Sequence, residues 1–367
     1  MLCWGNNLNG QLGNGSTLST TSPSPVSGDI FFARVAAGDT FTCGLSDNNE
    51  LFCWGLYVDS SGVVVENHEP QLLDTELVIS NVSCGSVHCC ALTEEHQAYC
   101  WGHNSHGQAG TGETSAQEGF TLIEGMQFNT LLPGGRHTCG IATDGETYCW
   151  GANNYGQLGN ESTDGQYSPS LVLSTVSFQK LAAGESYNCA IDTNGEVWCW
   201  GLVDNSTDQQ LFVVSPEKVS FPSDLTVFVD GRIHARGHVT CVEEYERYCW
   251  GQNTYGQLGC GDRIDHYTYP VRCLNEYSDA FNLVVGGNHT CGIGAHYDAW
   301  CWGNNSSGQL GDGTTKDSTE AVMVQHILSD SEDCSCVAGR KTSMNLVPLF
   351  LLGLGAFFLF RRRRQMY

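Results

Sequence analysis

The tripeptide Cys-Trp-Gly occurs seven times in this chain of 367 residues, and its spacing limits the fold more than any other feature. The copies begin at residues 3, 53, 100, 149, 199, 249 and 301. The period is therefore about 50 residues, which is typical of propeller blades rather than of helical solenoid repeats. The 44 glycines and the 10% of aromatic residues favour short strands joined by tight turns. We predict an all-β ring of repeats instead of the two domains that the length alone suggests.

Most cysteines recur in pairs that bracket a turn. Five pairs are ten residues apart and the sixth is eight apart, with turn residues such as Asp144-Gly145 between them. Residues placed symmetrically about a hairpin turn lie on the same face of the sheet. Shortening the turn by two residues keeps the two cysteines on the same face, because side chains alternate with a period of two. Each bond would contribute at most roughly 2 to 3 kcal/mol by the chain-entropy estimate. The predicted cross-strand disulfides are Cys43–Cys53, Cys90–Cys100, Cys139–Cys149, Cys189–Cys199, Cys241–Cys249 and Cys291–Cys301.

Other cysteines lie outside this pattern. Cys84 and Cys89 flank a short segment, and Cys260 and Cys273 bracket a loop, so each pair is predicted to form a local bridge. Cys3 has no partner upstream, which means either that the given start truncates the gene product or that the C-terminal part supplies the partner. The segment 337–343 resembles residues 36–42 and could close the ring beside Cys3. A total of 19 cysteines with such spacing indicates an oxidising compartment.

A second motif follows most of the Cys-Trp-Gly copies. It reads Asn-x-x-Gly-Gln-Leu-Gly, as at residues 153–159, and a Gly-x-x-His-Thr segment lies at residues 134–138. Five of the seven loops match, one with Ala109 in place of leucine, whereas those after Gly55 and Gly201 do not. From residue 1 to about 325 the sequence resembles the regulator of chromosome condensation repeat family. The resemblance implies a seven-bladed β-propeller with four strands per blade.

The cysteine pairs add a second resemblance within that family. They are similar to those of crinkly-type plant receptor kinase ectodomains and of secreted bacterial repeat proteins. Nuclear members of the family lack such pairs. The resemblance therefore implies an extracellular variant.

The C-terminal segment is apolar and then strongly basic. Residues 344–360 carry no charge, and Arg361, Arg362, Arg363 and Arg364 follow directly. As a helix this run spans about 26 Å, so we predict a transmembrane helix whose arginines stay cytoplasmic. The predicted domains are a propeller at 1–329, a juxtamembrane linker or ring-closing strand at 330–343, the helix at 344–360 and a basic tail at 361–367. The tail, with its preceding cysteines, also resembles the cysteine-containing sorting signals of myxobacterial surface proteins, which are trimmed by a protease.

No catalytic, cofactor or metal site is predicted from the sequence. It contains neither a Gly-x-Ser-x-Gly nucleophile elbow nor a phosphate-binding Gly-Lys-Ser/Thr loop. His103 with His106, or His88 with its neighbouring cysteines, could be drawn as a metal site. However, a histidine recurs at the position of His88, which favours a structural brace of the strand turn. The recurring tryptophans are expected to fill the space between blades rather than to stack on sugars.

Charge and topology together predict a binding role at the cell surface or outer membrane. The formal net charge of -24 disfavours nucleic acid as a partner, because phosphate backbones are bound by lysine and arginine. We expect a monomeric, membrane-anchored propeller whose body is extracellular and whose loops bind an unidentified protein or a surface glycan without catalysis. One alternative, implied by nuclear family members, is nucleotide exchange on a small GTPase. A further alternative is a secreted protein inhibitor, as in the bacterial β-lactamase inhibitory propeller of similar fold.

Overall fold

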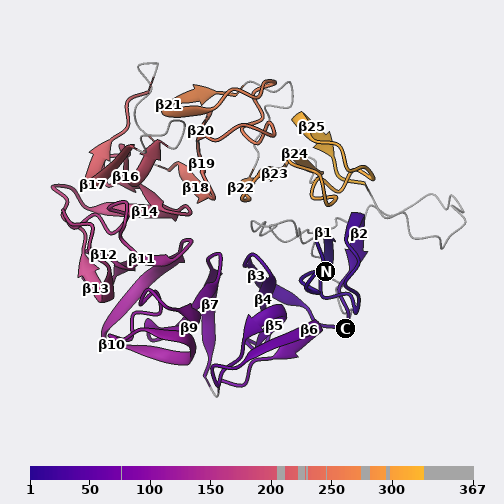
Figure 1. Ribbon diagram of the computed structural model, residues 1–367, viewed down its shortest axis with the longest axis horizontal. Helices are drawn as coiled ribbons and strands as arrows, with labels where there is room; N and C mark the ends of the chain where they lie inside the picture. Colours follow the sequence, from indigo (N-terminus) through magenta and orange to yellow (C-terminus); the bar gives the residue numbers. More distant parts are fainter. Residues whose placement is uncertain are drawn as a thin grey trace, which may run out of the picture.

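The computed structural model is an all-β ring of antiparallel sheets (Figure 1). It describes residues 1–75, 77–204, 211–221, 228, 230–244, 246–273, 282–294 and 298–325, and no helix occurs among them. Within these residues no segment therefore forms a helix suited to crossing a membrane. The predicted linker, helix and basic tail at 330–367, including Arg361 to Arg364, lie outside the described residues.

Four of the sheets have four strands each, and the strands follow one another in chain order. The sheets are β3 (Phe32–Ala37), β4 (Phe41–Ser46), β5 (Leu51–Val58) and β6 (Val64–Leu72); β14 (Phe178–Ala183), β15 (Tyr187–Asp192), β16 (Val197–Asp204) and β17 (Leu211–Lys218); β18 (Arg232–Arg236), β19 (Val239–Glu243), β20 (Arg247–Gly251) and β21 (His266–Arg272); β22 (Asn282–Val285), β23 (His289–Ile293), β24 (Ala299–Gly303) and β25 (Ser318–Met323). The first strand of a sheet lies toward the centre of the ring, as Figure 1 shows for β3 and β22.

The long strand β10 (Ser115–Pro133) joins two consecutive repeats into one sheet of seven strands. Its first part pairs with β9 and its last part, from Phe128 onward, pairs with β11. The other strands of this sheet are β7 (Ile79–Cys84), β8 (His88–Thr93), β9 (Gln97–Asn104), β11 (His137–Ala142), β12 (Thr147–Gly151) and β13 (Gln166–Leu171). Each repeat thus keeps the same order of strands in this continuous sheet.

The first repeat forms a sheet of two strands, β1 (Leu2–Gly5) and β2 (Thr20–Pro25), among the described residues. It lies between β25 and the sheet of β3 to β6 (Figure 1). The indole of Trp4 donates a hydrogen bond to the carbonyl of Gln309, at 3.1 Å, which joins the two ends of the described chain. The ring-closing segment predicted at 330–343 lies outside these residues, so seven complete blades remain a prediction.

The hairpins have the register that the cysteine spacing predicts. Cys43 lies directly opposite Cys53, and the shorter hairpin places Cys241 opposite Cys249. All eight predicted pairs are bonded in the structure, with Cα atoms 4.1 Å apart in the Cys43–Cys53 pair. Cys3 is buried and is the free cysteine of the described residues.

The tryptophan of each repeat packs between neighbouring repeats. Trp150 belongs to a cluster with Leu92 and Ile123, and Trp200 to one with Ile141 and Leu158. Both indoles are fully buried, which removes a large apolar area from water. The prediction that these side chains form the core between blades is confirmed.

Candidate functional site

Two sets of loops leave the strands at the same end of each sheet and form one face of the ring. Because β4 and β5 are antiparallel with Phe41 opposite Gly55, the turn before β4 and the loop after β5 lie at the same end. The same pairing recurs at Tyr187 with Gly201. We call this side of the ring the loop face.

Each Asn-x-x-Gly-Gln-Leu-Gly loop is held together by its own asparagine. The side chain of Asn153 accepts a hydrogen bond from the amide of Leu158 at 2.9 Å and donates to the carbonyls of Ser162 and Asp164 at 2.9 and 3.0 Å. The final glycine, Gly159, has a φ of +65°, and a Cβ there would come within 2.9 Å of Trp200 in the next sheet. The motif therefore builds a rigid loop that fits closely against the following blade.

The glutamine of this motif anchors the next blade through its backbone carbonyl. The carbonyl of Gln108 accepts hydrogen bonds from the Trp150 indole at 3.0 Å and from the Thr138 hydroxyl at 2.8 Å. The equivalent double acceptors are Gln11 with Trp54 and Thr42, Gln157 with Trp200 and Asn188, and Gln257 with Trp302 and Thr290. A buried carbonyl thus satisfies two buried donors at each of these interfaces.

The turns that follow the inner strands are hydrogen-bonded to one another around the centre of the ring. We call the turns at residues 38–39, 85–86, 134–135, 184–185 and 237–238 the collar. The amides of Asp39 and Ser86 donate to the carbonyls of Ser86 and Gly134, at 2.9 and 3.1 Å. The amide of Glu185 donates to the carbonyl of Gly237 at 2.8 Å. The collar therefore links five repeats through their backbones on the loop face.

Arg236, at the end of β18, reaches across the ring to the collar turns of other repeats. Its guanidinium donates to the carbonyls of Cys84 at 2.9 Å and Ala37 at 3.3 Å, and it lies 3.6 Å from the carboxylate of Asp39. The hydroxyl of Ser86 donates to the Glu185 carboxylate at 2.9 Å. One nearly buried cation is thereby placed beside two carboxylates at the centre of the loop face.

The electrostatics of the collar follow from partial burial. Burial lowers the pKa of Arg236, while Asp39 and Glu185 oppose that shift. Burial also raises the pKa of Asp39, against the attraction of Arg236. His238 has a lowered pKa, because burial outweighs the attraction of Glu185. Nearly half of the Asp39 side chain is exposed, so the collar offers a carboxylate to donor groups of a partner.

The recurring histidines brace both their own turn and the next repeat. A Cβ on Gly134 would lie 2.3 Å from the His137 ring, so this imidazole fills the space beneath the turn. His137 is hydrogen-bonded to Asn188 at 3.0 Å, and His88 to Thr138 at 2.7 Å, each across an interface between repeats. The sequence predicts that these histidines support their own turns, but it does not predict their hydrogen bonds to the next repeat.

The groups considered as metal ligands have other contacts in the structure. His103 and His106 lie in one repeat loop, where they contact Gln108 and Ser105 respectively, at 3.2 and 2.9 Å. Among the described residues, the sulfurs of Cys43, Cys84 and Cys89 lie close enough together to share an ion. All three are already in disulfides, and only a thiolate is a metal ligand of this kind.

Residues 1–273 match the family described as RCC1-like domain. The chain belongs to this family. Human alsin is 33% identical over 103 residues, which covers 28% of this chain and 6% of alsin. The chain therefore matches a small part of that relative's length.

Solved structures show the same fold at low sequence identity. The crystal structure of human WBSCR16 has a TM-score of 0.76 at 21% identity, and the match covers 89% of this chain and 93% of WBSCR16. Prp20p from Saccharomyces cerevisiae, described with its binding properties to Gsp1p and histones, has a TM-score of 0.73 at 18% identity. That match covers 89% of this chain and 86% of Prp20p. The described part of this RCC1-like chain is thus a propeller of the same type.

Sequence reasoning missed Arg236, Asp39 and Glu185. A signal was present, because Arg236 takes the place that a glycine, such as Gly38 or Gly286, holds in other repeats. In all three repeats the preceding residue pairs with the threonine that lies opposite the repeat tryptophan. A cation at a position that is otherwise glycine is unusual in a nearly buried strand end. The identity of its partners depended on the closure of the ring, which brings residues 152 and 199 positions apart into contact.

Replacing Arg236 by methionine in this RCC1-like domain is expected to lower the free energy of unfolding by about 2 to 4 kcal/mol. The change leaves two carbonyls without their charged donor and the collar carboxylates without their cation. Urea denaturation followed by circular dichroism measures the loss. Arg232→Met is the matched control, because Arg232 is exposed on the same strand and should change stability by less than about 0.5 kcal/mol. Equal losses in the two variants would contradict a central role for Arg236.

Proposed function

We propose that the protein is a cell-surface propeller that binds another protein or a surface glycan through its loop face and has no catalytic activity. The disulfides carry this proposal. Eight of them hold the described residues, and such bonds persist in oxidising compartments and are rare in the cytosol. The body of the protein is therefore proposed to be extracellular.

The proposal includes a closed ring and an anchor. Residues 330–343 would complete the sheet that begins with β1 and β2, so that the ring has seven blades. Residues 344–360 would cross the membrane, with Arg361 to Arg364 on the cytoplasmic side. If the tail is instead a cysteine-containing sorting signal, a protease removes it and the mature protein stays at the outer surface.

A binding role is supported by the rigidity of the loop face. The repeat loops are fixed by buried asparagines such as Asn153, and the collar turns are fixed to each other. A surface that is ordered before binding loses little conformational entropy when a partner docks. The net charge of -24 favours a partner with a basic or neutral surface over nucleic acid.

Regulation of a small GTPase is the second candidate function. It is favoured by the likeness to Prp20p, whose description names binding to Gsp1p, although 18% identity supports only a common fold. This function requires residence in the cytosol or nucleus, where thiols are kept reduced. A secreted inhibitor is compatible with the disulfides but does not require an anchor.

Thiol state and location distinguish these functions in one experiment. Intact source cells are treated with a membrane-impermeant protease, and the protein is alkylated without reductant and examined by mass spectrometry. The proposal predicts release of the propeller by the protease, and disulfide-linked peptides for the eight pairs. Protected protein with alkylated, reduced cysteines would overturn the surface location and favour the GTPase candidate. Intact protein found in the medium, without an anchored form, would favour the inhibitor.

A further inference from the structure

Two repeats lack the Asn-x-x-Gly-Gln-Leu-Gly loop, and their strands continue into long hairpins instead. β5 pairs with β6 as far as Val58, and β16 pairs with β17 as far as Asp204. The next tryptophans along the ring, Trp101 and Trp250, therefore receive no glutamine carbonyl from the preceding repeat. Neither indole has a hydrogen bond within the described part of the chain, unlike the five anchored ones.

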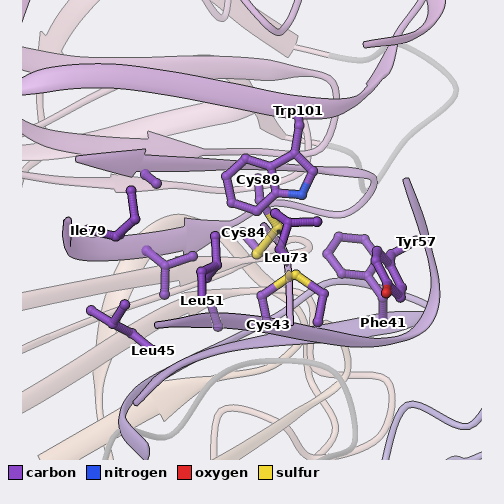
Figure 2. Packing of buried hydrophobic residues seen from close by; sticks show 14 residues of the cluster. Phe41, Cys43, Leu45, Leu51, Tyr57, Leu73, Ile79, Cys84, Cys89 and Trp101 are labelled. Carbon is purple, nitrogen blue, oxygen red and sulfur yellow. Dashed lines mark hydrogen bonds between the residues drawn. A yellow bond between two sulfur atoms is a disulfide. The ribbon is translucent and has the colours of Figure 1, made fainter. Parts of the chain in front are cut away.

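The first of these interfaces is filled by other side chains of the protein. Tyr57 is buried in the same cluster as Trp101, and Phe120 lies over the Trp101 indole with ring centroids 5.1 Å apart. Cys89 takes the position that Thr42 and Thr138 hold elsewhere, and its bond to Cys84 removes the second donor. Figure 2 shows Trp101, Leu73 and the Cys84–Cys89 bond packed together above Cys43. At this interface aromatic side chains take the place of the loop, and of the two usual donors only the Trp101 indole remains.

The second interface holds a cavity of about 280 Å³ instead. Its lining includes Leu202, Val203 and Val213 from one sheet, and Thr240 and Trp250 from the next. Trp250 is 8% exposed, whereas the anchored Trp150 and Trp200 are completely buried. The threonine and the tryptophan that bind a carbonyl at three other interfaces, with Thr42, Thr138 and Thr290, are thus both retained here, with an open space in front of them.

The hydroxyl groups at this cavity can still donate a hydrogen bond. Thr240 donates to the hydroxyl of Tyr187 at 2.8 Å, and Tyr187 also lines the cavity. Two hydroxyls that share one hydrogen bond leave one proton for another acceptor. Together with the Trp250 indole, the cavity therefore has two donors for a single carbonyl, as the filled interfaces do.

We propose that this cavity binds a peptide segment of a partner protein that presents a backbone carbonyl followed by a leucine-sized aliphatic side chain. The other interfaces indicate the occupant, because there the Gln-Leu pair of the preceding loop fills the equivalent space. In the Gln157-Leu158 pair, the carbonyl accepts from Trp200 and Asn188, and the leucine is completely buried. In a ligand with the same two groups, the carbonyl accepts a hydrogen bond from the Trp250 indole, and the aliphatic side chain packs against Leu202 and Val213.

The size of the cavity agrees with a single side chain and its flanking backbone. Sites for drug-sized molecules usually measure about 300 to 1,000 Å³, so this cavity lies just below that range. The inference rests on the proposed function as a protein-binding module, and it identifies one anchor point on the loop face. The charged collar would be a separate part of the same binding surface.

The test uses the full chain in detergent micelles with tryptophan indoles labelled with ¹⁵N, and the probe is the peptide acetyl-Gly-Gln-Leu-Gly-amide. We expect saturable shifts of the Trp250 indole resonance, assigned through Trp250→Phe, while the Trp150 and Trp200 resonances stay fixed. The peptide acetyl-Gly-Gln-Ala-Gly-amide should bind at least tenfold more weakly, because it buries less apolar area. No movement of the Trp250 resonance at millimolar peptide would overturn the proposal.

Two variants locate the binding in the cavity. Val203→Tyr should fill the space and abolish the shifts, with unchanged resonances elsewhere as evidence of folding. Thr240→Val should weaken binding several-fold, whereas Thr42→Val, which removes the same hydroxyl at a filled interface, should not change the affinity. Binding retained in Val203→Tyr would contradict the assignment, and so would equally tight binding of the small amide N-isobutylacetamide. Failure of these tests with preserved surface location and partner binding would reject the cavity but not the proposed function.

Discussion

Reduction of the eight disulfides is expected to unfold the propeller. Each bond closes a loop of 5 to 13 residues, and the chain-entropy estimate gives each roughly 2 to 3 kcal/mol. The sum is on the order of 20 kcal/mol as an upper bound, whereas the free energy of unfolding of a domain is commonly about 5 to 15 kcal/mol. The reduced chain should therefore lack native tryptophan packing at 37 °C.

The measurement requires denaturant, because the bonded sulfurs are buried. Cys43, Cys139 and Cys241, for example, are fully shielded from solvent. The protein is reduced and alkylated in urea, the urea is removed, and near-ultraviolet circular dichroism is recorded. Oxidised protein taken through the same urea cycle is the control and should regain its native spectrum. A native spectrum from the alkylated chain would show that the hydrophobic core suffices without the bonds.

The sequence was sufficient to predict the features that depend only on how side chains alternate between the two faces of a hairpin. The hairpin register at Cys43–Cys53 and the eight-residue variant at Cys241–Cys249 follow from spacing alone, because side chains alternate with a period of two. The fused sheet through β10 was not predicted, since its separate pairing partners on either side of Phe128 depend on how two repeats meet in space. Local patterns define a hairpin but not the continuity between hairpins.

The candidate site was harder to predict because it depends on contacts between distant repeats. The contact of Arg236 with Ala37 and Cys84 exists only once the ring has formed. The cavity beside Trp250 arises because the chain after Gly201 lacks the Asn-x-x-Gly-Gln-Leu-Gly motif. The chain after Gly55 lacks it too, but there Tyr57 and Phe120 pack in the same cluster as Trp101. The sequence marks both loops as departures from the motif, but only packing shows that one space is filled and the other open.

Acidification from pH 7 to pH 5 is expected to destabilise the protein through its buried histidines. Burial lowers the pKa of His88 to about 3 and that of His289 to about 4, and it also lowers the pKa of His137. In the unfolded chain a histidine has a pKa of about 6.5, so the unfolded state binds more protons below that pH. The stabilisation is therefore fully present above pH 6.5 and is lost as the pH falls toward 4 for His289 and toward 3 for His88. At pH 5 the loss is about 2 kcal/mol for each of His88 and His289.

General charge effects predict the opposite trend, which makes the comparison informative. As the pH falls toward the isoelectric point of about 4.6, the net charge of -24 becomes smaller in magnitude, and the weaker repulsion between acidic side chains should stabilise the fold. His289→Phe separates the two effects, because Phe41 fills the equivalent place beneath its turn glycine, as the close approach to Gly38 shows. Urea denaturation at pH 7 and pH 5 should give a difference in unfolding free energy that is about 2 kcal/mol smaller in the variant than in the native chain. An unchanged difference would mean that His289 is not the source, and that the acidic side chains govern the response to pH.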